Sequence, residues 1–141
     1  MNLPVRSISE LQRVMAQFPQ CLPPTEHFFA DWMYCRVVTR DAGVLIVGKV
    51  HKREHFYMVV KGAVAVIQDG AEPRIYEAPS ILVSKVGTRR AVLAVEDSVC
   101  LTVHRTDKTD LTEIEEELIE DDPTALFDAY NQLKEIRHEL G

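Results

Sequence analysis

The segment from Gly43 to Gly62, GVLIVGKVHKREHFYMVVKG, constrains the fold of this chain more than any other stretch. Its two halves, residues 44–50 and 55–61, are rich in β-branched and aromatic residues, which favours two short strands around a polar connection. Gly62 separates the second run from residues 63–68, and a glycine at that point suits a tight hairpin. The segment therefore predicts consecutive strands, with His51 and His55 beside the first connection.

Residues 28–106 form a zone with a strong β pattern. Its short β-branched runs are 32–38, 44–50, 55–61, 63–68, 74–76, 81–86, 90–95 and 99–104. Because no helical pattern lies between them, they predict a mainly β, closed or double-sheet antiparallel structure. The runs FYMVV, AVAVI and AVLAV do not alternate, so we expect both faces of the sheets to be covered. The outer cover is either the terminal helices or a second subunit.

Helical patterns lie on both sides of this zone. Residues 1–27 predict a short N-terminal helix and a linker, since Ser7 and Glu10 form a capping box and several prolines follow. Residues 107–141 predict acidic C-terminal helices, the first capped by Asp110 and the second starting at Asp122 and Pro123. We expect the three zones to form one folded unit.

Charge and composition exclude several classes of protein. The formal net charge is −6, and residues 107–141 alone carry three basic and twelve acidic side chains, so we expect no nucleic-acid partner. No apolar run reaches the roughly 18 residues of a membrane helix, and no signal sequence is evident, so we expect no membrane partner. Cys21, Cys35 and Cys100 form no CxxC pair, which predicts reduced thiols in a cytoplasmic protein.

The spacing within the segment from Gly43 to Gly62 resembles the first motif of the cupin superfamily: glycine, five residues, His-x-His, three residues, Glu, six residues, glycine. Lys49 stands at the first histidine, His51 at the second, and His55 at the glutamate. The resemblance implies a cupin-type antiparallel jelly-roll barrel over about residues 28–106, often with one metal inside. The chain also resembles small uncharacterised cupin-like proteins of bacteriophage and prophage genomes, which implies the host cytoplasm.

The second motif of the family is less complete. Its pattern, run from Pro79, puts Lys85 at the expected proline, keeps Gly87, and places Arg90 at the fourth metal ligand. Lysine and arginine are cationic at neutral pH and have no lone pair for a metal. The resemblance therefore implies the fold, while the usual ligand set is incomplete.

One interpretation of the site is a metal centre. His51 and His55 suit a divalent transition metal such as Zn, Ni, Fe or Cu, and the best third ligand is His104. The orientation of His104 stays open, because Val99, Leu101 and Val103 alternate with the polar set that contains it. If the apolar set faces the core, then His104 points outward; if the barrel centre is polar, then it points inward.

A second interpretation is a pocket for a small polar or anionic molecule. Lys49, His51, Arg53 and His55 share one parity, so a regular strand would send them to one face. Tyr57 follows that parity as well. Arg90 would project from the opposed strand and grip a carboxylate or a phosphate. A third interpretation is a barrel that has lost its ligand.

Three classes of function follow from these interpretations. The first is a non-enzymatic cupin-fold binding module for a small polar or anionic ligand or a protein partner. The second is a metal-dependent cupin enzyme of the dioxygenase or isomerase type that uses His51 and His55, and the third is a structural or assembly accessory protein. No catalytic residue is identified. The apolar strands and the stripe of Leu126, Tyr130, Leu133, Ile136 and Leu140 predict a homodimer.

Overall fold

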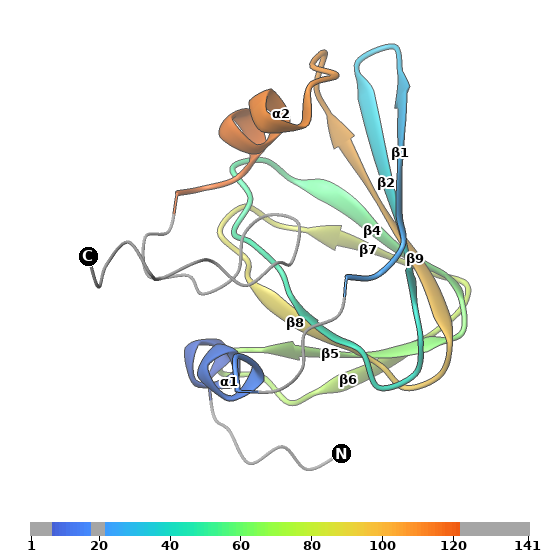
Figure 1. Cartoon of the computed structure of the whole chain (residues 1–141), viewed down its shortest axis with the longest axis vertical. Coiled ribbons are helices and arrows are strands. Elements are labelled where there is room, and N and C mark those ends of the chain that lie inside the picture. The colour runs from blue at the N-terminus through green and yellow to red at the C-terminus, as the bar shows by residue number, and fades with distance from the viewer. Residues whose placement is uncertain (1–6, 18–21, 122–141) are drawn as a thin grey trace.

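A computed structural model describes residues 7–17 and 22–121 of the chain, and the predicted mainly β fold is confirmed within these ranges (Figure 1). In chain order the elements are α1 (Ile8–Met15), β1 (Thr25–Ala30), β2 (Met33–Arg40), β3 (Leu45–Val47), β4 (His55–Lys61), β5 (Ala63–Gln68), β6 (Arg74–Glu77), β7 (Ser80–Ser84), β8 (Arg90–Ala94), β9 (Ser98–Arg105) and α2 (Leu111–Leu118). The strands form two antiparallel sheets, ordered β1-β2-β9-β4-β7 and β3-β8-β5-β6.

The structure differs from the expected strands at three places. Strand β1 begins at Thr25, inside the segment 1–27 that was expected to be helix and linker, and it pairs with β2 as a hairpin. Trp32, expected to begin a strand, instead lies in the turn of that hairpin with a φ of 61°. The expected strand 44–50 is also shorter, because only Leu45–Val47 pairs regularly with β8.

The main core lies between the two sheets. Val59 of β4 and Val64 of β5 are fully buried, and they join a cluster with Val66, Val92 and Cys100. Along each strand these inward-facing residues alternate with residues that face away, as the two-residue period of a strand requires. Neighbouring strands are therefore held together by both the hydrogen-bond ladder and the buried apolar side chains.

Helix α1 covers part of the outer surface of the smaller sheet. Ser7 caps the helix, because its Oγ accepts a hydrogen bond from the backbone amide of Glu10 at 3.1 Å. Ile8 and Leu11 pack against Val47 and Ala91 on the sheet. This helix thus supplies one of the expected outer covers, which explains how β3 and β8 can be apolar on both faces.

The outer face of the larger sheet is apolar and open to solvent among the described residues. The register aligns one residue from each strand in a row across it, and that row is Phe28, Cys35, Val103, Phe56 and Val83. Phe28 is 52% exposed and Phe56 is 48% exposed. We refer to this surface, with the next row of Val37, Leu101, Met58 and Ile81, as the outer apolar face.

Helix α2 lies at one end of the barrel, next to the segment between β3 and β4. Ile114 and Leu118 pack against Tyr34 of β2. Asp110 caps the helix, since its carboxylate accepts hydrogen bonds from the amides of Thr112 and Glu113. The expected second C-terminal helix, with its apolar stripe, lies outside the described residues. No helix in the described part of the chain is long and apolar enough to span a membrane.

Candidate metal and ligand site

Three histidines meet inside the barrel, two from the segment around the start of β4 and one from β9. His51 lies between β3 and β4, His55 begins β4, and His104 lies near the end of β9. The ring centroids of His51 and His55 are 4.2 Å apart, those of His55 and His104 are 4.5 Å apart, and those of His51 and His104 are 5.2 Å apart. One ligand nitrogen from each ring lies within 4.8 Å of the others. The geometry thus answers the open question about His104, which points inward.

Strand register explains how His55 and His104 meet. Phe56 pairs with Val103 in the antiparallel ladder between β4 and β9, so the residues beside this pair, His55 and His104, share the inner face. Phe56 and Val103 consequently point to the outer apolar face. The apolar members of β9 face outward, and the polar members face the barrel.

His51 is held by backbone contacts rather than by a regular strand. It forms an isolated antiparallel bridge with Ile119, which follows α2. Its Nδ1 lies 3.0 Å from the carbonyl oxygen of Lys49, so the tautomer with a proton on Nδ1 donates to that oxygen and leaves Nε2 with a lone pair. The carbonyl of His51 also accepts a hydrogen bond from the amide of Gly87 at 3.4 Å.

The environment keeps these imidazoles neutral. Burial, helped by the nearby His51, lowers the pKa of His55 to about 4. Burial lowers the pKa of His104 to about 2, with His55 and His51 adding to the effect. Burial also lowers the pKa of His51, although its hydrogen bond to Lys49 opposes this. A neutral imidazole has a free lone pair, so all three rings are in the form that binds metals.

The donor set fits a borderline transition metal. Nδ1 of His55 is buried and has no hydrogen-bond partner among the described residues, which is costly unless a ligand or an ion satisfies it. Nε2 of His104 lies 2.8 Å from the hydroxyl of Thr102, and such a contact orients a ligating ring. Three imidazoles without a carboxylate suit Zn, Fe, Ni or Cu better than Mg or Ca.

The histidines line a cavity of about 110 Å³. Four cationic side chains also line it, and they are Arg36, Arg40, Lys49 and Arg90. Apolar side chains from both sheets complete the wall, including those of Val38, Ile46 and Val92. No aspartate or glutamate in the described ranges contributes to the lining. The cavity is therefore cationic with partly apolar walls.

The structure brings together five of the six residues expected to contact a ligand. Lys49, His51, His55, Tyr57 and Arg90 all line the cavity. Burial raises the pKa of the Tyr57 phenol, so its hydroxyl is protonated. The guanidinium carbon of Arg90 lies 5.7 Å from the centre of the Tyr57 ring, a cation–π arrangement.

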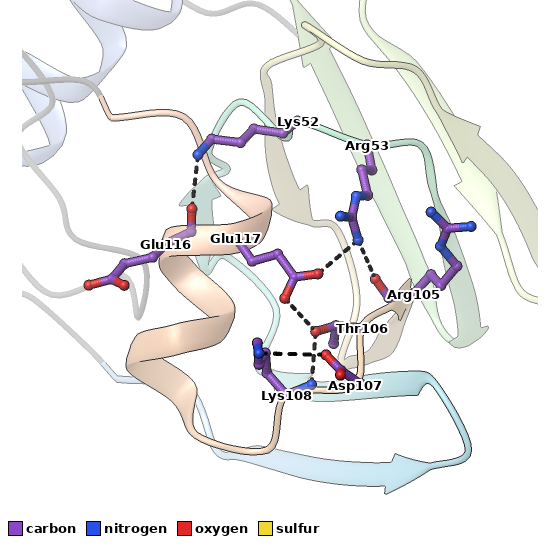
Figure 2. A network of polar contacts seen from close by, with 8 residues as sticks. All are labelled: Lys52, Arg53, Arg105, Thr106, Asp107, Lys108, Glu116 and Glu117. Carbon is purple, nitrogen blue, oxygen red and sulfur yellow. Dashed lines mark hydrogen bonds and ion pairs between the residues drawn. The ribbon is translucent and has the colours of Figure 1, made fainter.

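Arg53 does not join this group. Its guanidinium donates to Oε1 of Glu117 at 2.9 Å and to the carbonyl of Arg105 at 3.1 Å (Figure 2). Arg53 does not line the cavity. The parity rule fails here because the segment between β3 and β4 is not a regular strand. Within that segment, only His51 forms a β-bridge, and its partner is Ile119. The expectation that Arg53 and the histidines share one face is wrong for this reason.

Sequence reasoning missed Arg36 and Arg40. Both belong to β2 and lie on the inner face with Tyr34 and Val38. A signal is present for Arg36, because it alternates with Tyr34 and Val38 within the predicted strand 32–38. Arg40 continues this alternation two residues beyond the predicted end of the strand. An arginine that alternates with core residues is unusual for a surface, since arginine is rarely fully buried without a partner.

The architecture is shared with known cupin structures. No family model and no curated protein sequence matches this chain. An RmlC-like cupin protein from Desulfovibrio desulfuricans is 21% identical over 57% of this chain and 79% of its own, with a TM-score of 0.51. KdgF from Halomonas sp. is 20% identical over 62% of this chain and 81% of its own, with a TM-score of 0.53.

A cupin superfamily protein from Desulfitobacterium hafniense extends the likeness to 76% of this chain and 94% of its own, at 10% identity and a TM-score of 0.50. At these identities the comparisons show the fold, which is that of the cupin proteins. The function has to be argued from the residues of this chain itself.

Proposed function

We propose that this protein is a cupin-type jelly roll that holds one divalent transition metal on His51, His55 and His104 and accepts a small ligand in the adjoining cavity. The observation that carries the proposal is the convergence of three ligand nitrogens within 4.8 Å of one another. Three neutral imidazoles are a known protein ligand set for zinc, and they leave a coordination position for water or a ligand.

The residues around the metal have separate roles in this proposal. The carbonyl of Lys49 and the hydroxyl of Thr102 orient the rings of His51 and His104. Apolar side chains limit the water around the rings. When bound, the metal supplies Lewis acidity and a fixed point for an oxygen or nitrogen atom of the ligand.

Metal analysis tests this proposal directly. The protein is purified without a histidine tag, stripped with a chelator, and then dialysed against Zn(II), Ni(II), Cu(II) or anaerobic Fe(II). We expect about one equivalent of at least one metal by elemental analysis, and a large loss in the variants His51→Ala and His104→Gln. His27→Ala is the matched control, because His27 lies outside the cluster and contacts Tyr34.

Two results would contradict the proposal. One is a wild-type protein that retains no metal after reconstitution. The other is equal metal content in His51→Ala and His27→Ala, both folded by circular dichroism. Melting curves of the variants separate loss of the metal site from loss of the fold.

A metal-dependent enzyme is a second candidate for the same site. The three-histidine arrangement favours it, because no fourth protein ligand from the described residues completes the cluster. Turnover of a small ligand by the metal-loaded protein, absent from the stripped protein, would support this candidate over a binding module.

A further inference from the structure

Four cationic residues line the cavity next to the histidines. These residues are Arg36, Arg40, Lys49 and Arg90, and no aspartate or glutamate of the described ranges lines the cavity. Removing cations from water costs several kcal/mol per ion unless an opposite charge or hydrogen-bond acceptors replace the solvent. The cavity therefore has the electrostatic form of an anion site.

Arg40 gives the clearest sign that a partner is missing. Arg40 is the last residue of β2, and it is only 5% exposed. Its Nη1 donates to the carbonyl of Val92 at 3.4 Å, a long hydrogen bond, and its Nε is buried with no partner among the described residues. A guanidinium has five N–H donors, so Arg40 keeps most of its capacity for an acceptor in the cavity.

Arg90 reaches the same cavity from the opposite sheet. It donates to the hydroxyl of Ser84, and Ser84 pairs directly with His55 across β7 and β4. The guanidinium of Arg90 also lies over the ring of Tyr57, whose buried hydroxyl has no hydrogen-bond partner in the described part of the chain. Arg90 therefore lies beside the histidine cluster, and the hydroxyl of Tyr57 is a further hydrogen-bond donor next to it.

We propose that the cavity binds a small organic anion whose carboxylate or phosphate contacts the guanidinium groups of Arg40 and Arg90, close to the three histidines. Arginine binds both oxyanions in a bidentate manner, so both share one recognition chemistry. Arg36 adds positive charge from β2, where it pairs with Thr102 of the neighbouring strand β9. The inference deepens the proposed function by naming its ligand class, while the arginines themselves need no metal.

The walls limit the rest of the ligand. A volume of about 110 Å³ holds several water molecules or a group of a few non-hydrogen atoms. Val38, Ile46 and Val92 offer apolar contact to a short carbon body. The expected ligand is therefore a short acid or phosphate ester, with its uncharged end free to approach the histidines.

The experiment compares an anion with a neutral molecule of nearly the same shape, and it includes a second anion. Lactate, its neutral amide lactamide and inorganic phosphate are titrated into the full-length protein by calorimetry at constant ionic strength. Each titration is made with metal-free and with metal-loaded protein. We expect lactate or phosphate to bind both forms and raise their melting temperature, whereas lactamide binds at least about tenfold more weakly.

The relative affinities of lactate and phosphate decide between a carboxylate and a phosphate ligand. Arg90→Gln should weaken the binding of the preferred anion about ten- to a hundredfold, and Arg90→Lys should restore part of it. Arg74→Gln is the control, because Arg74 is an exposed cation on β6 outside the cavity.

The inference is overturned if lactamide binds as well as lactate, if neither anion binds, or if Arg90→Gln and Arg74→Gln bind alike. It is also overturned if anions bind only when metal is present and the arginine variants bind normally. If the Arg90→Gln variant does not fold, then the comparison of lactate with lactamide on the wild-type protein decides the question. Metal content is measured separately, so failure of the metal proposal and failure of the anion proposal give different results.

Discussion

The imidazole ring of His104 stacks on that of His55, with the two ring centroids 4.5 Å apart and an interplanar angle of 28°. The two residues belong to adjacent strands, and His51 lies against both rings. Protonating any of these rings puts a charge into a buried site beside arginines. The cluster is therefore stable only while its histidines are neutral, and this links folding to pH.

The first prediction is that the metal-free protein loses stability as the pH falls from about 7 to 5.5. The histidines have a pKa near 6.5 when unfolded, but about 4 for His55 and about 2 for His104 when folded. The unfolded chain therefore binds more protons in this window, so stability is complete above pH 6.5 and declines below it. Each histidine contributes up to about 1.4 kcal/mol per pH unit.

Urea unfolding with chelator present, at several values between pH 7.5 and 5.5, measures this slope. Carboxylates titrate mainly below the window. The variant His104→Gln should show a shallower pH dependence than the wild type. A free energy of unfolding that is flat across the window would contradict the depressed histidine pKa values.

The second prediction concerns Gly62, which has a φ of 76° and connects β4 to β5. An added Cβ would lie against the backbone carbonyl of Asp97 and 2.6 Å from Oγ of Ser98. Gly62→Ala should therefore cost several kcal/mol, combining the left-handed backbone penalty of about 1–2 kcal/mol with a steric clash.

Gly70→Ala is the matched control, because Gly70 has a φ of 73° and open space around the added Cβ. It should cost only the backbone penalty. Thermal or urea unfolding of the two variants measures the difference. Equal destabilisation would show that the approach of Asp97 and Ser98 to Gly62 is unimportant.

The third prediction concerns the contacts that attach α2 to the barrel. The carboxylate of Glu117 accepts hydrogen bonds from Arg53 and from the buried hydroxyl of Thr106 (Figure 2). Arg53→Gln should cost less than about 1 kcal/mol, because the pair is partly exposed to solvent. Glu117→Ala should cost more, because it also leaves the Thr106 hydroxyl without this acceptor.

The pair of Lys85 and Glu54 provides the comparison, since it is more exposed at 74% and 53%. Lys85→Gln should change the free energy of unfolding by only a few tenths of a kcal/mol. A double-mutant cycle on Arg53 and Glu117 isolates their coupling. The same cycle is made for Lys85 and Glu54. A coupling free energy between Arg53 and Glu117 that equals the one between Lys85 and Glu54 would contradict the special role of Glu117.

The fourth prediction is that the outer apolar face joins two copies of this chain. The face spans five strands, or roughly 24 Å at about 4.8 Å per strand, and nine of the ten positions in its two central rows are apolar or cysteine. Large apolar patches are rare on monomers, and a twofold dimer is the simplest closed arrangement that covers one.

Light scattering after size-exclusion chromatography should give twice the mass of one chain. Phe56→Lys should shift the protein toward the monomer, whereas Ile75→Lys, at a 61% exposed position on β6 of the smaller sheet, should not. A wild-type protein that is monomeric at tens of micromolar, or equal behaviour of the two variants, would refute this prediction.

The sequence predicts the mainly β fold because short β-branched runs and turn residues are local signals. The spacing between Gly43 and Gly62 adds the resemblance to cupins, which implies the jelly roll. It also predicts that His51 and His55 meet, since they stand at ligand positions of the motif that the segment resembles. His104 could not be assigned, because β9 carries apolar residues on its outward side and polar residues on its inward side. That inversion of the usual pattern is visible only once the neighbouring strands are in place.

The errors in the predicted site have physical causes as well. Arg53 was placed by strand parity, and a segment without regular pairing has no such parity. Arg36 and Arg40 were missed although their alternation with Tyr34 and Val38 is readable. Single-sequence patterns treat arginine as a surface residue, and burial of its long side chain depends on tertiary contacts.

The attachment of His51 to Ile119 has a consequence for the order of events during protein synthesis. His51 forms a β-bridge with Ile119. On either side of it, the amide of Lys52 donates to the carbonyl of Leu118, and the amide of Glu120 donates to the carbonyl of Val50. All nine described strands leave the ribosome before residues 118–120 do. A nascent chain that has reached only Arg105 carries every histidine of the cluster but still lacks the backbone contacts of residues 50–52 with residues 118–120. We expect binding of the proposed metal to follow the emergence of residues 118–120 from the ribosome.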